Sequence, residues 1–244
     1  MAHFFVSPKN FRGRQFFFDP SESRHLAQVL RKKAGDLIRV FNGEGIVSEA
    51  KILDASRPER VTGELLRTIS TGSRSRKIIN IHPALLKGPR FDWLLEKLTE
   101  LSVAEIHPIL TERTVVRFAN EKAAGKIERW EKIILSAAKQ CGRETFPRIY
   151  PAVSFQKAVS SLPKEDLNLI LWEAEEKCSL AEALHSPKSS ATQTINLIVG
   201  PEGGLSVQEA QTAILAGAKP VHLGERILRA ETAAIAAAAY LILS

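Results

Sequence analysis

The chain has 244 residues, 44% of them hydrophobic, which is ordinary for a folded core and excludes a disordered chain. Its two cysteines, Cys141 and Cys178, are too few for a disulfide framework and lack the histidine spacing of a zinc site, so we expect a reducing cytoplasm and no metal. The 34 Lys and Arg exceed the 27 Asp and Glu, and the formal charge of +7 favours a polyanionic partner. A basic enzyme that binds no polyanion would have the same composition.

The chain begins without a basic region that leads into a long apolar run, so we expect no secretory signal. The longest apolar stretch, residues 233–243, is too short to cross a bilayer, and we expect no membrane partner. This stretch predicts a helix that is buried on nearly all sides.

The first 70 or so residues predict short strands separated by turns. We expect strands at residues 15–18, 37–41, 46–53 and 61–66. Between the second and third of them, residues 42–45 (Asn-Gly-Glu-Gly) supply the residues that a tight hairpin needs at positive φ. This arrangement predicts a small β-barrel.

One helix is expected among these strands. Asp19 is placed to cap it, Pro20 to occupy its first position, and Glu22 to follow three residues after the cap. We expect Leu26, Val29 and Leu30 to form the apolar stripe of this helix, and hence its buried face.

Residues 70–77 are small, polar and basic, as in an exposed linker, so we expect two domains at 1–72 and 73–244. After the linker, apolar runs at 78–81, 167–171 and 195–199 alternate with helical patterns around 91–101 and 126–141. This alternation predicts an α/β domain with a mainly parallel sheet.

The sharpest motif is a buried-strand pattern, residues 196–199, that ends abruptly in Gly200-Pro201-Glu202-Gly203-Gly204. Ser206 and Glu209 fit a capping box, so a helix should start there and the loop should lie at the carboxyl end of a strand, where open α/β sheets place ligands. The loop lacks the spacing of a phosphate or dinucleotide loop, and Glu202 suits a neutral or cationic ligand such as a sulfonium. A plain strand-to-helix turn would also account for the glycines.

A second motif, residues 221–233, carries a glycine, two arginines and two glutamates in an otherwise apolar stretch. Glu231 and Thr232 open the alanine-rich helix. Charged groups beside a buried element are unfavourable unless they are paired or used, so this cluster is either functional or a structural ion pair of Glu231 with an arginine. Both interpretations can hold together.

Two further segments carry candidate cations. Lys87 and Arg90 stand at the start of a helix in which Leu94, Leu98 and Leu101 form the buried stripe. Cations oppose the macrodipole at that end, so phosphate binding explains them better than local stability does. Arg143 follows Gly142, which ends the next helix, and we expect it to be exposed, although an ordinary glycine-terminated helix gives the same pattern.

In this order and spacing, four motifs resemble the RsmE family of 16S rRNA uridine-N3 methyltransferases: residues 87–101, 140–143, 200–204 and 223–233. Residues 25–36 are similar to the family's N-terminal signature, so the resemblance covers nearly the whole chain. His3 stands where an arginine is more usual, which puts an RNA contact at that position in doubt.

The resemblance implies an N-terminal PUA-like β-barrel domain for RNA and a C-terminal SPOUT domain with a trefoil knot, a mainly parallel sheet and a homodimeric state. It implies S-adenosylmethionine as cofactor and 16S rRNA of the small ribosomal subunit as partner. The cofactor contacts that it implies are Leu171, Gly200, Glu202, Leu223, Gly224, Ile227, Leu228, Arg229 and Thr232.

The expected reaction moves a methyl group to uracil N3, which must lose its proton. Arg229 and Arg90 are candidates to stabilise the uracil anion, and Glu202 and Glu231 are candidate bases. Two alternatives stay open: a non-catalytic RNA-binding ribosome assembly factor, and a methyltransferase for a different RNA nucleoside. The expected RNA contacts are Arg12, Arg14, Arg31, Lys32, Lys33, Lys87, Arg90 and Arg143.

Overall fold

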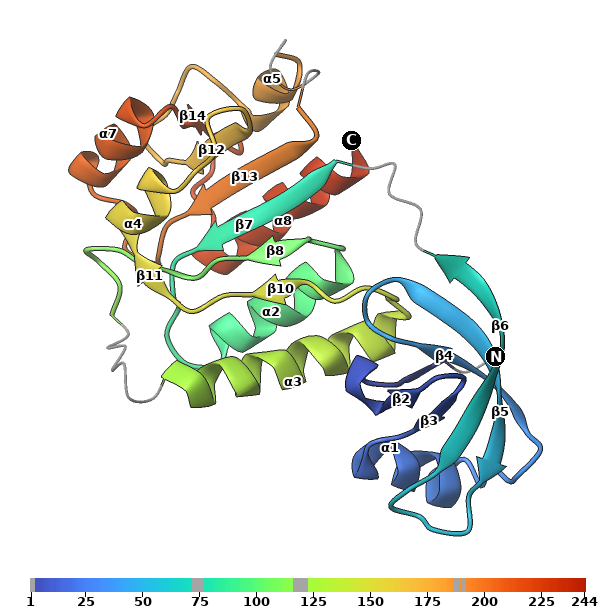
Figure 1. Cartoon of the computed structure of the whole chain (residues 1–244). Coiled ribbons are helices and arrows are strands. Elements are labelled where there is room, and N and C mark those ends of the chain that lie inside the picture. Colours follow the sequence, from blue (N-terminus) through green and yellow to red (C-terminus); the bar gives the residue numbers. More distant parts are fainter. Residues whose placement is uncertain (1–2, 72–76, 116–122, 187–188, 190–191) are drawn as a thin grey trace. The chain divides into compact units, whose positions relative to one another are not determined.

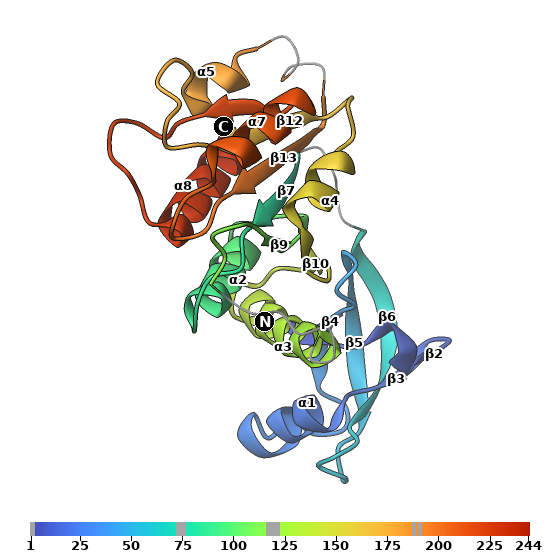
Figure 2. The same ribbon diagram turned by 90° about the vertical axis from the view of Figure 1, so that its left-hand side faces the viewer.

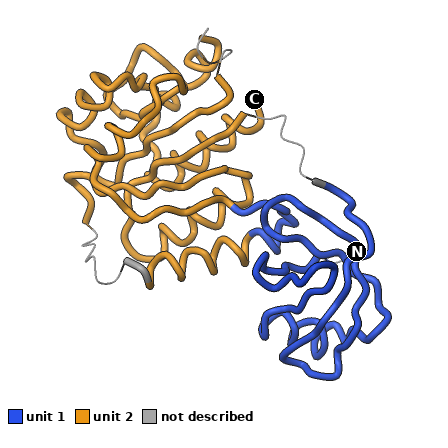
Figure 3. The backbone as a smooth tube through the Cα atoms, viewed as in Figure 1, with its two compact units in different colours: residues 1–75, 138–146 blue, residues 76–137, 147–244 orange. Residues whose placement is uncertain are grey.

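A computed structural model describes residues 3–71, 77–115, 123–186, 189 and 192–244. The chain forms two compact units (Figure 3). Unit 1 holds residues 1–75 and 138–146, and unit 2 holds residues 76–137 and 147–244. The expected domain boundary at residues 72–73 lies outside the described residues.

Unit 1 is a curled, mainly antiparallel sheet with the strand order β1-β4-β5-β6-β3-β2 (Figure 1). Its strands are β1 (His3–Phe5), β2 (Phe11–Arg12), β3 (Gln15–Phe17), β4 (Leu37–Phe41), β5 (Ile46–Asp54) and β6 (Thr62–Thr71). The four predicted strands are confirmed, and so is the hairpin, in which Gly43 and Gly45 have φ of 80° and 95°. Strands β1 and β2 were not predicted, because segments of three and two residues carry too little periodicity.

The helical part of unit 1 differs from its prediction. After a short 3-10 turn, η1 (Pro8–Asn10), helix α1 (Pro20–Arg24) starts where expected, but the Asp19 carboxylate accepts from the Asn10 side chain at 3.0 Å rather than from the helix. The chain then winds into a π-helix, η2 (His25–Val29). The predicted apolar stripe is wrong: Leu26 is buried, whereas Val29 is 68% and Leu30 is 40% exposed. A π turn holds more residues than an α turn, so these two side chains rotate away from the core.

Unit 2 contains a fully parallel sheet in the order β10-β8-β7-β13-β12-β14, which confirms the predicted mainly parallel sheet. A small parallel pair, β9 (Ile109–Leu110) and β11 (Val153–Ser154), lies apart from it. The strands of the main sheet are β7 (Ile78–Pro83), β8 (Glu105–Ile106), β10 (Arg148–Ile149), β12 (Leu167–Leu171), β13 (Thr194–Val199) and β14 (Lys219–Val221).

Helices cover both faces of this sheet, as the nearly continuous burial of β7, β12 and β13 requires. Leu197 packs into the core beneath α2 and α8, and the next residue, Ile198, packs into the core beneath α4 and α7. Figure 2 shows α8 and α4 on opposite sides of β7 and β13. The helices are α2 (Arg90–Glu100), α3 (Ala123–Cys141), α4 (Phe155–Ser160), α5 (Leu180–Leu184), α7 (Val207–Leu215) and α8 (Ala230–Leu243).

The C-terminal helix α8 is less enclosed than predicted. Its buried side packs against α2, β7 and β13, but Tyr240 is 42% and Leu243 is 79% exposed, and Thr232 and Ala236 are exposed on the preceding turns. Across the described ranges, no helix is both long and apolar enough to span a membrane.

A polar column stands on the α4 side of the sheet. The rings of His82, His107 and Tyr150 stack with centroid separations of 4.6 Å and 4.2 Å, and Glu105 bonds to both His107 and Tyr150. His82 is buried, and among the described residues its ring nitrogens have no hydrogen-bond partner. Burial, together with the nearby charge of His107, lowers the pKa of His82 to about 3.

We expect His82 to make the fold sensitive to acid. The unfolded chain binds the proton near the ordinary pKa of 6.5, whereas the folded chain binds it only near 3, so the free energy of unfolding should fall as the pH drops from about 6.5 towards 3. In His82→Phe, which keeps a stacking ring without a proton site, urea denaturation at a series of pH values should show a shallower fall. His185→Phe is the control, because His185 is exposed. If the free energy of unfolding of His82→Phe fell as steeply with pH as that of the wild type, His82 would not be the source of the acid sensitivity.

Candidate functional site

A cavity of about 340 Å3 lies where three neighbouring parallel strands, β12, β13 and β14, reach their carboxyl ends. Its size is that of a small-molecule site, and its position is the one at which open α/β sheets bind ligands. The lining residues come from the segments that follow the three strands and from the start of α8: Leu171, Trp172, Glu173, Glu175, Val199, Gly200, Pro201, Glu202, Gly203, Gly204, Val221, His222, Leu223, Gly224, Glu225, Arg226, Ile227, Leu228, Ala230 and Ala233.

The loop after β13 is crowded at two of its glycines, by the buried Leu205 at Gly200 and by the end of the exposed Glu173 side chain at Gly204. A Cβ on Gly200 would lie 2.9 Å from Cγ of Leu205, and a Cβ on Gly204 would lie 2.1 Å from Oε1 of Glu173. Gly204 also has a φ of +70°, which side-chain-bearing residues rarely adopt. The loop then ends in α7, whose predicted capping box of Ser206 and Glu209 is confirmed.

The segment after β14 closes the opposite side of the cavity. Gly224 turns the chain at a φ of +114°, and its N–H donates to Nδ1 of His222 at 3.0 Å. Ile227 and Leu228 then line the cavity although Ile227 is 86% exposed, so this wall is formed by side chains that also face solvent. Figure 2 shows this segment standing out from the sheet before the chain enters α8.

The cavity is predominantly acidic. Glu173, Glu175, Glu202 and Glu225 line it, against the single guanidinium of Arg226. A carboxylate-lined, partly enclosed space attracts a cation and repels phosphate, because charge interactions weaken less there than in bulk water.

An arginine from α2 connects this cavity to the start of α8. The Arg90 guanidinium lies 3.4 Å from Oε1 of Glu202 and 3.9 Å from Oε1 of Glu231, and the backbone N–H of Lys87 also donates to Glu202, at 3.1 Å. Glu231 is only 6% exposed, and its Oε2 has no partner within the described ranges. The two carboxylates explain why a cation is tolerated at the start of α2.

Comparison with known proteins matches both parts of the chain to RNA methyltransferases. Residues 73–242 match a model of the RNA methyltransferase domain, and residues 18–66 match a model of the RNA methyltransferase PUA domain. The chain is 31% identical to ribosomal RNA small subunit methyltransferase E of Synechocystis, over 93% of this chain and 73% of the relative. It is 30% identical to the Buchnera aphidicola (Acyrthosiphon pisum) protein of that name, over 91% of this chain and 86% of the relative.

Among solved structures, ribosomal RNA small subunit methyltransferase E from Neisseria gonorrhoeae, bound to S-adenosyl methionine, is 33% identical, with a TM-score of 0.85 over 99% of this chain and 96% of that chain. A Legionella pneumophila protein in complex with the cofactor SAM is 31% identical, with a TM-score of 0.85 and the same coverage. The chain belongs to the ribosomal RNA small subunit methyltransferase E (RsmE) family. This confirms the resemblance and the class of RNA methyltransferase expected from the motifs.

In this RsmE chain, the turns around residues 200 and 224 and the start of α8 meet at one cavity, as the motifs predict. Of the nine expected cofactor contacts, seven line it, whereas Arg229 and Thr232 are exposed and are not among the lining residues. The candidate catalytic residues Arg90 and Glu231 contact each other, and Arg90 contacts Glu202, while Arg229 stands apart as the N-cap residue of α8.

The expected RNA contacts divide between the units of this RsmE chain. Arg12, Arg14, Arg31, Lys32, Lys33 and Arg143 lie in unit 1, and Lys87 and Arg90 lie in unit 2. Arg14 is already bonded to the carbonyls of Leu65 and Leu66. Arg143, expected to be exposed, is half-buried, and this burial lowers its pKa to about 10. The chain turns back at the glycine-terminated end of α3, and the backbone N–H of Arg143 donates to the Ala138 carbonyl there.

Sequence reasoning missed part of the cavity wall and the support behind it. Trp172, Glu173 and Glu175 follow β12, a strand end that carries no glycine motif. Behind the loop, the buried Glu209 carboxylate accepts from the N–H of Glu112 at 2.8 Å and from that of Ser206 at 3.0 Å. Arg113, next to Glu112, donates to the Gly203 carbonyl at 2.8 Å, so residues 112–113 brace the glycine-rich loop. The Thr-Glu-Arg-Thr run at 111–114 gives no hint of this, because its partners lie about 90 residues away.

We expect Glu209→Gln to destabilise unit 2 by about 1–3 kcal/mol, because the amide replaces a charged acceptor of two backbone N–H groups with one that also presents a donor to them. Urea denaturation measures the loss. Glu128→Gln is the control: within the described ranges Glu128 pairs with Lys132 on the exposed side of α3, so its loss should leave stability nearly unchanged. Equal effects for the two variants would show that the brace contributes nothing.

Proposed function

We propose that this RsmE-family chain transfers a methyl group from S-adenosylmethionine to N3 of a uridine in 16S rRNA of the small ribosomal subunit, in the cytoplasm. The observation that carries the proposal is the acidic, glycine-walled cavity at the carboxyl ends of β12, β13 and β14. Relatives named ribosomal RNA small subunit methyltransferase E, one of them bound to S-adenosyl methionine, support the cofactor and the substrate.

The residues present fit this cofactor. Leu171, Leu223, Ile227 and Leu228 offer apolar walls, Gly200 and Gly204 let the backbone approach closely, and the four glutamates favour a positively charged sulfur. When bound, S-adenosylmethionine would supply a methyl group to uracil N3 from its sulfonium, whose S–CH3 bond would break and leave the electron pair on a neutral thioether. The residues that would hold it are Leu171, Gly200, Glu202, Leu223, Gly224, Ile227, Leu228, Arg229 and Thr232.

The chain's own residues would handle the proton and the charge. Uracil N3 is protonated at neutral pH, so a base must take that proton before N3 can act as a nucleophile. Glu202 lines the cavity, and this position favours it as the base; Arg90 and the Lys87 N–H orient its carboxylate. Glu231, which shares Arg90, is the second candidate.

Arg229 is favoured over Arg90 for stabilising the uracil anion. Arg90 already faces two carboxylates, whereas Arg229 is exposed beside the cavity-lining Leu228 and Ala230 and forms no ion pair in the described part of the chain. N3 lies on the Watson–Crick edge, so the target base must be unpaired or flipped to reach these groups.

Unit 1 would serve as the RNA-binding PUA-like barrel, as its match to a PUA domain model supports. We place the domain boundary at residues 72–73, between domains 1–72 and 73–244. Its contacts to RNA would be Arg12, Arg14, Arg31, Lys32, Lys33 and Arg143, with Lys87 and Arg90 nearer the chemistry.

A trefoil knot, expected for a SPOUT domain, is the proposed topology of unit 2. The segment 221–222 is bonded on one side to Trp172, just after β12, and on the other side to Cys178 and Leu180. These bonds join residues 221–222 to both ends of the continuous stretch 172–180, which supports a path in which the chain passes through that stretch on its way into α8.

A homodimer is the proposed assembly. The exposed side of α8 presents Ala236, Tyr240 and Leu243, and the neighbouring α2 exposes Trp93, which is 46% exposed. A second copy of this chain would cover such an apolar face.

We expect Gly204→Ala to weaken S-adenosylmethionine binding about tenfold, because the added methyl would displace the Glu173 carboxylate from its position in the cavity wall. Gly217→Ala is the matched control: Gly217 also has a positive φ, of +96°, but a Cβ there would meet nothing within 4 Å. Both variants should lose similar stability from backbone strain, and only the first should lose affinity in calorimetry. If Gly204→Ala and Gly217→Ala bound S-adenosylmethionine with equal affinity, this wall would not be part of the cofactor site.

The activity is tested by mass spectrometry of rRNA from cells that lack the gene, complemented with variants. We expect a uridine methyl in 16S rRNA to disappear and to return with the wild type and with Lys157→Ala, which removes an exposed cation from α4. Arg229→Ala should fold normally and be slower by about 10²–10³-fold in transfer. A methyl on another nucleoside would assign a different substrate, and cofactor binding without any missing methyl would favour an assembly factor.

A further inference from the structure

The end of helix η2 is held in an unfavourable backbone conformation. Arg31 has a φ of +51°, in the left-handed region where the residue that ends a helix is normally glycine. The Lys32 N–H closes this end by donating to the Leu26 carbonyl at 3.0 Å, and the Leu30 N–H donates to the His25 carbonyl at 3.0 Å. Local stability would favour glycine at position 31, so the arginine side chain calls for another explanation.

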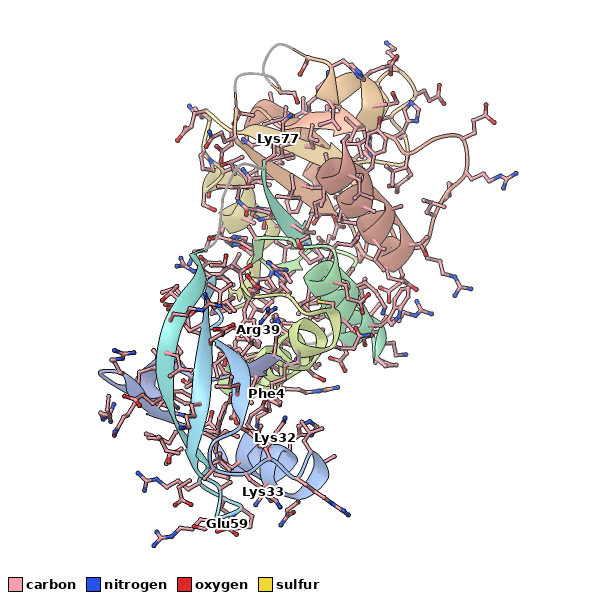
Figure 4. The ribbon with its side chains drawn as sticks, turned by 90° about the vertical axis from the view of Figure 1, so that its right-hand side faces the viewer. Phe4, Lys32, Lys33, Arg39, Glu59 and Lys77 are labelled. Carbon is pink, nitrogen blue, oxygen red and sulfur yellow. The ribbon has the colours of Figure 1, made fainter. Side chains whose placement is uncertain are left out.

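The surroundings of Arg31 are strongly basic. From residue 24 to residue 35 the chain has four cations, Arg24, Arg31, Lys32 and Lys33, and no acid. Glu22 is buried and bonded to Lys139, and Asp36 lies 4.0 Å from Lys32, so Arg24, Arg31 and Lys33 form no ion pair within the described ranges. Figure 4 labels Lys32 and Lys33, which lie at the end of the helical segment.

Two apolar side chains are exposed within this basic segment. Val29 and Leu30 immediately precede Arg31, and the π-helix turns both of them to solvent, away from the core that Leu26 enters. Phosphate groups alone would gain nothing from apolar neighbours. The flat faces of unpaired bases would, and a guanidinium both stacks on bases and bonds phosphate.

We propose that Val29, Leu30, Arg31, Lys32 and Lys33 form a surface, here called the η2 ridge, that binds unpaired nucleotides of RNA. The two apolar side chains pack against bases, Arg31 contacts both a base and a phosphate, and the lysines neutralise the backbone. The backbone strain at Arg31 is kept because glycine would lose this contact. The proposal rests on the proposed function, since it takes the substrate to be RNA.

The test compares stability with RNA binding in Arg31→Gly. Relief of the left-handed strain should leave the melting temperature unchanged or raise it by roughly 2–4 °C. Affinity for an RNA hairpin with a single-stranded loop should fall about tenfold at moderate salt, and the slope of log affinity against log salt should shrink by about one. Ser102→Gly is the matched control: Ser102 has a φ of +68° after α2 in unit 2, so it should show the same thermal effect with no change in RNA affinity.

The double variant Val29→Ser, Leu30→Ser tests the apolar contact. Its affinity for the loop hairpin should be several-fold weaker than that of the wild type. Its affinity for a fully paired duplex of equal length should match that of the wild type, and the slope of log affinity against log salt should not change. Equal loss on both RNAs would overturn the preference for unpaired bases. Unchanged hairpin affinity in Arg31→Gly, or a melting temperature several degrees lower, would overturn the role of Arg31. Binding is measured without cofactor, so it does not depend on methyl transfer. If the wild type bound the hairpin through the η2 ridge but transferred no methyl group, the proposed function would be wrong and the ridge proposal would stand.

Discussion

Backbone crowding after β13 is the constraint on which the site depends. At Gly200 the loop runs so close to Leu205 that no side chain fits, at Gly204 its φ of +70° favours glycine, and the brace from Glu209 and Arg113 holds the loop there. Strand β12 pairs with β13 on one side and with β14 on the other, and all three run parallel. Their carboxyl ends therefore lie at one edge of the sheet, where the segments that follow β12 and β14 meet this loop. The cavity therefore follows from strand order and from the absence of side chains rather than from one specific pair of groups.

Arg90 connects the glycine-rich loop to helices α2 and α8. It comes from the start of α2 and faces Glu202, in the glycine-rich loop, and Glu231, in the first turn of α8. A cation at a helix start opposes the local macrodipole, but two carboxylates within 4 Å outweigh that partial charge. The three segments are separated by more than 100 residues and about 30 residues, so their meeting is a property of the fold and of no single motif.

The sequence was informative wherever one local pattern decided the outcome. The capping box at Ser206 and Glu209, the glycines of the 42–45 hairpin and the three longer apolar strands all formed as predicted, because each depends on neighbours within a few residues. It failed where a distant partner or a change of helix type decided: Val29 and Leu30 match an α-helical stripe but lie on a π-helix, and Arg143 is half-buried although its residue type favours solvent. The wall formed by Glu173 and Glu175 was missed for the same reason, since only strand order brings it to the cavity.

The distribution of charge separates two binding tasks within one basic chain. The formal charge is +7, yet the cavity is lined by four glutamates and one arginine, so the field inside it has the opposite sign to that of the whole. Such a cavity favours a cationic ligand and disfavours a phosphate backbone. An RNA substrate must therefore gain its affinity from surfaces outside the cavity and present only an uncharged base to it. Arg31 and Lys33 of unit 1, which form no ion pair among the described residues, are available for such a surface, because the nearby acids Glu22 and Asp36 face Lys139 and Lys32. Because the cavity carboxylates all belong to unit 2, these acids and the cations of unit 1 are carried by different parts of the chain, and each part can meet a ligand of the opposite charge.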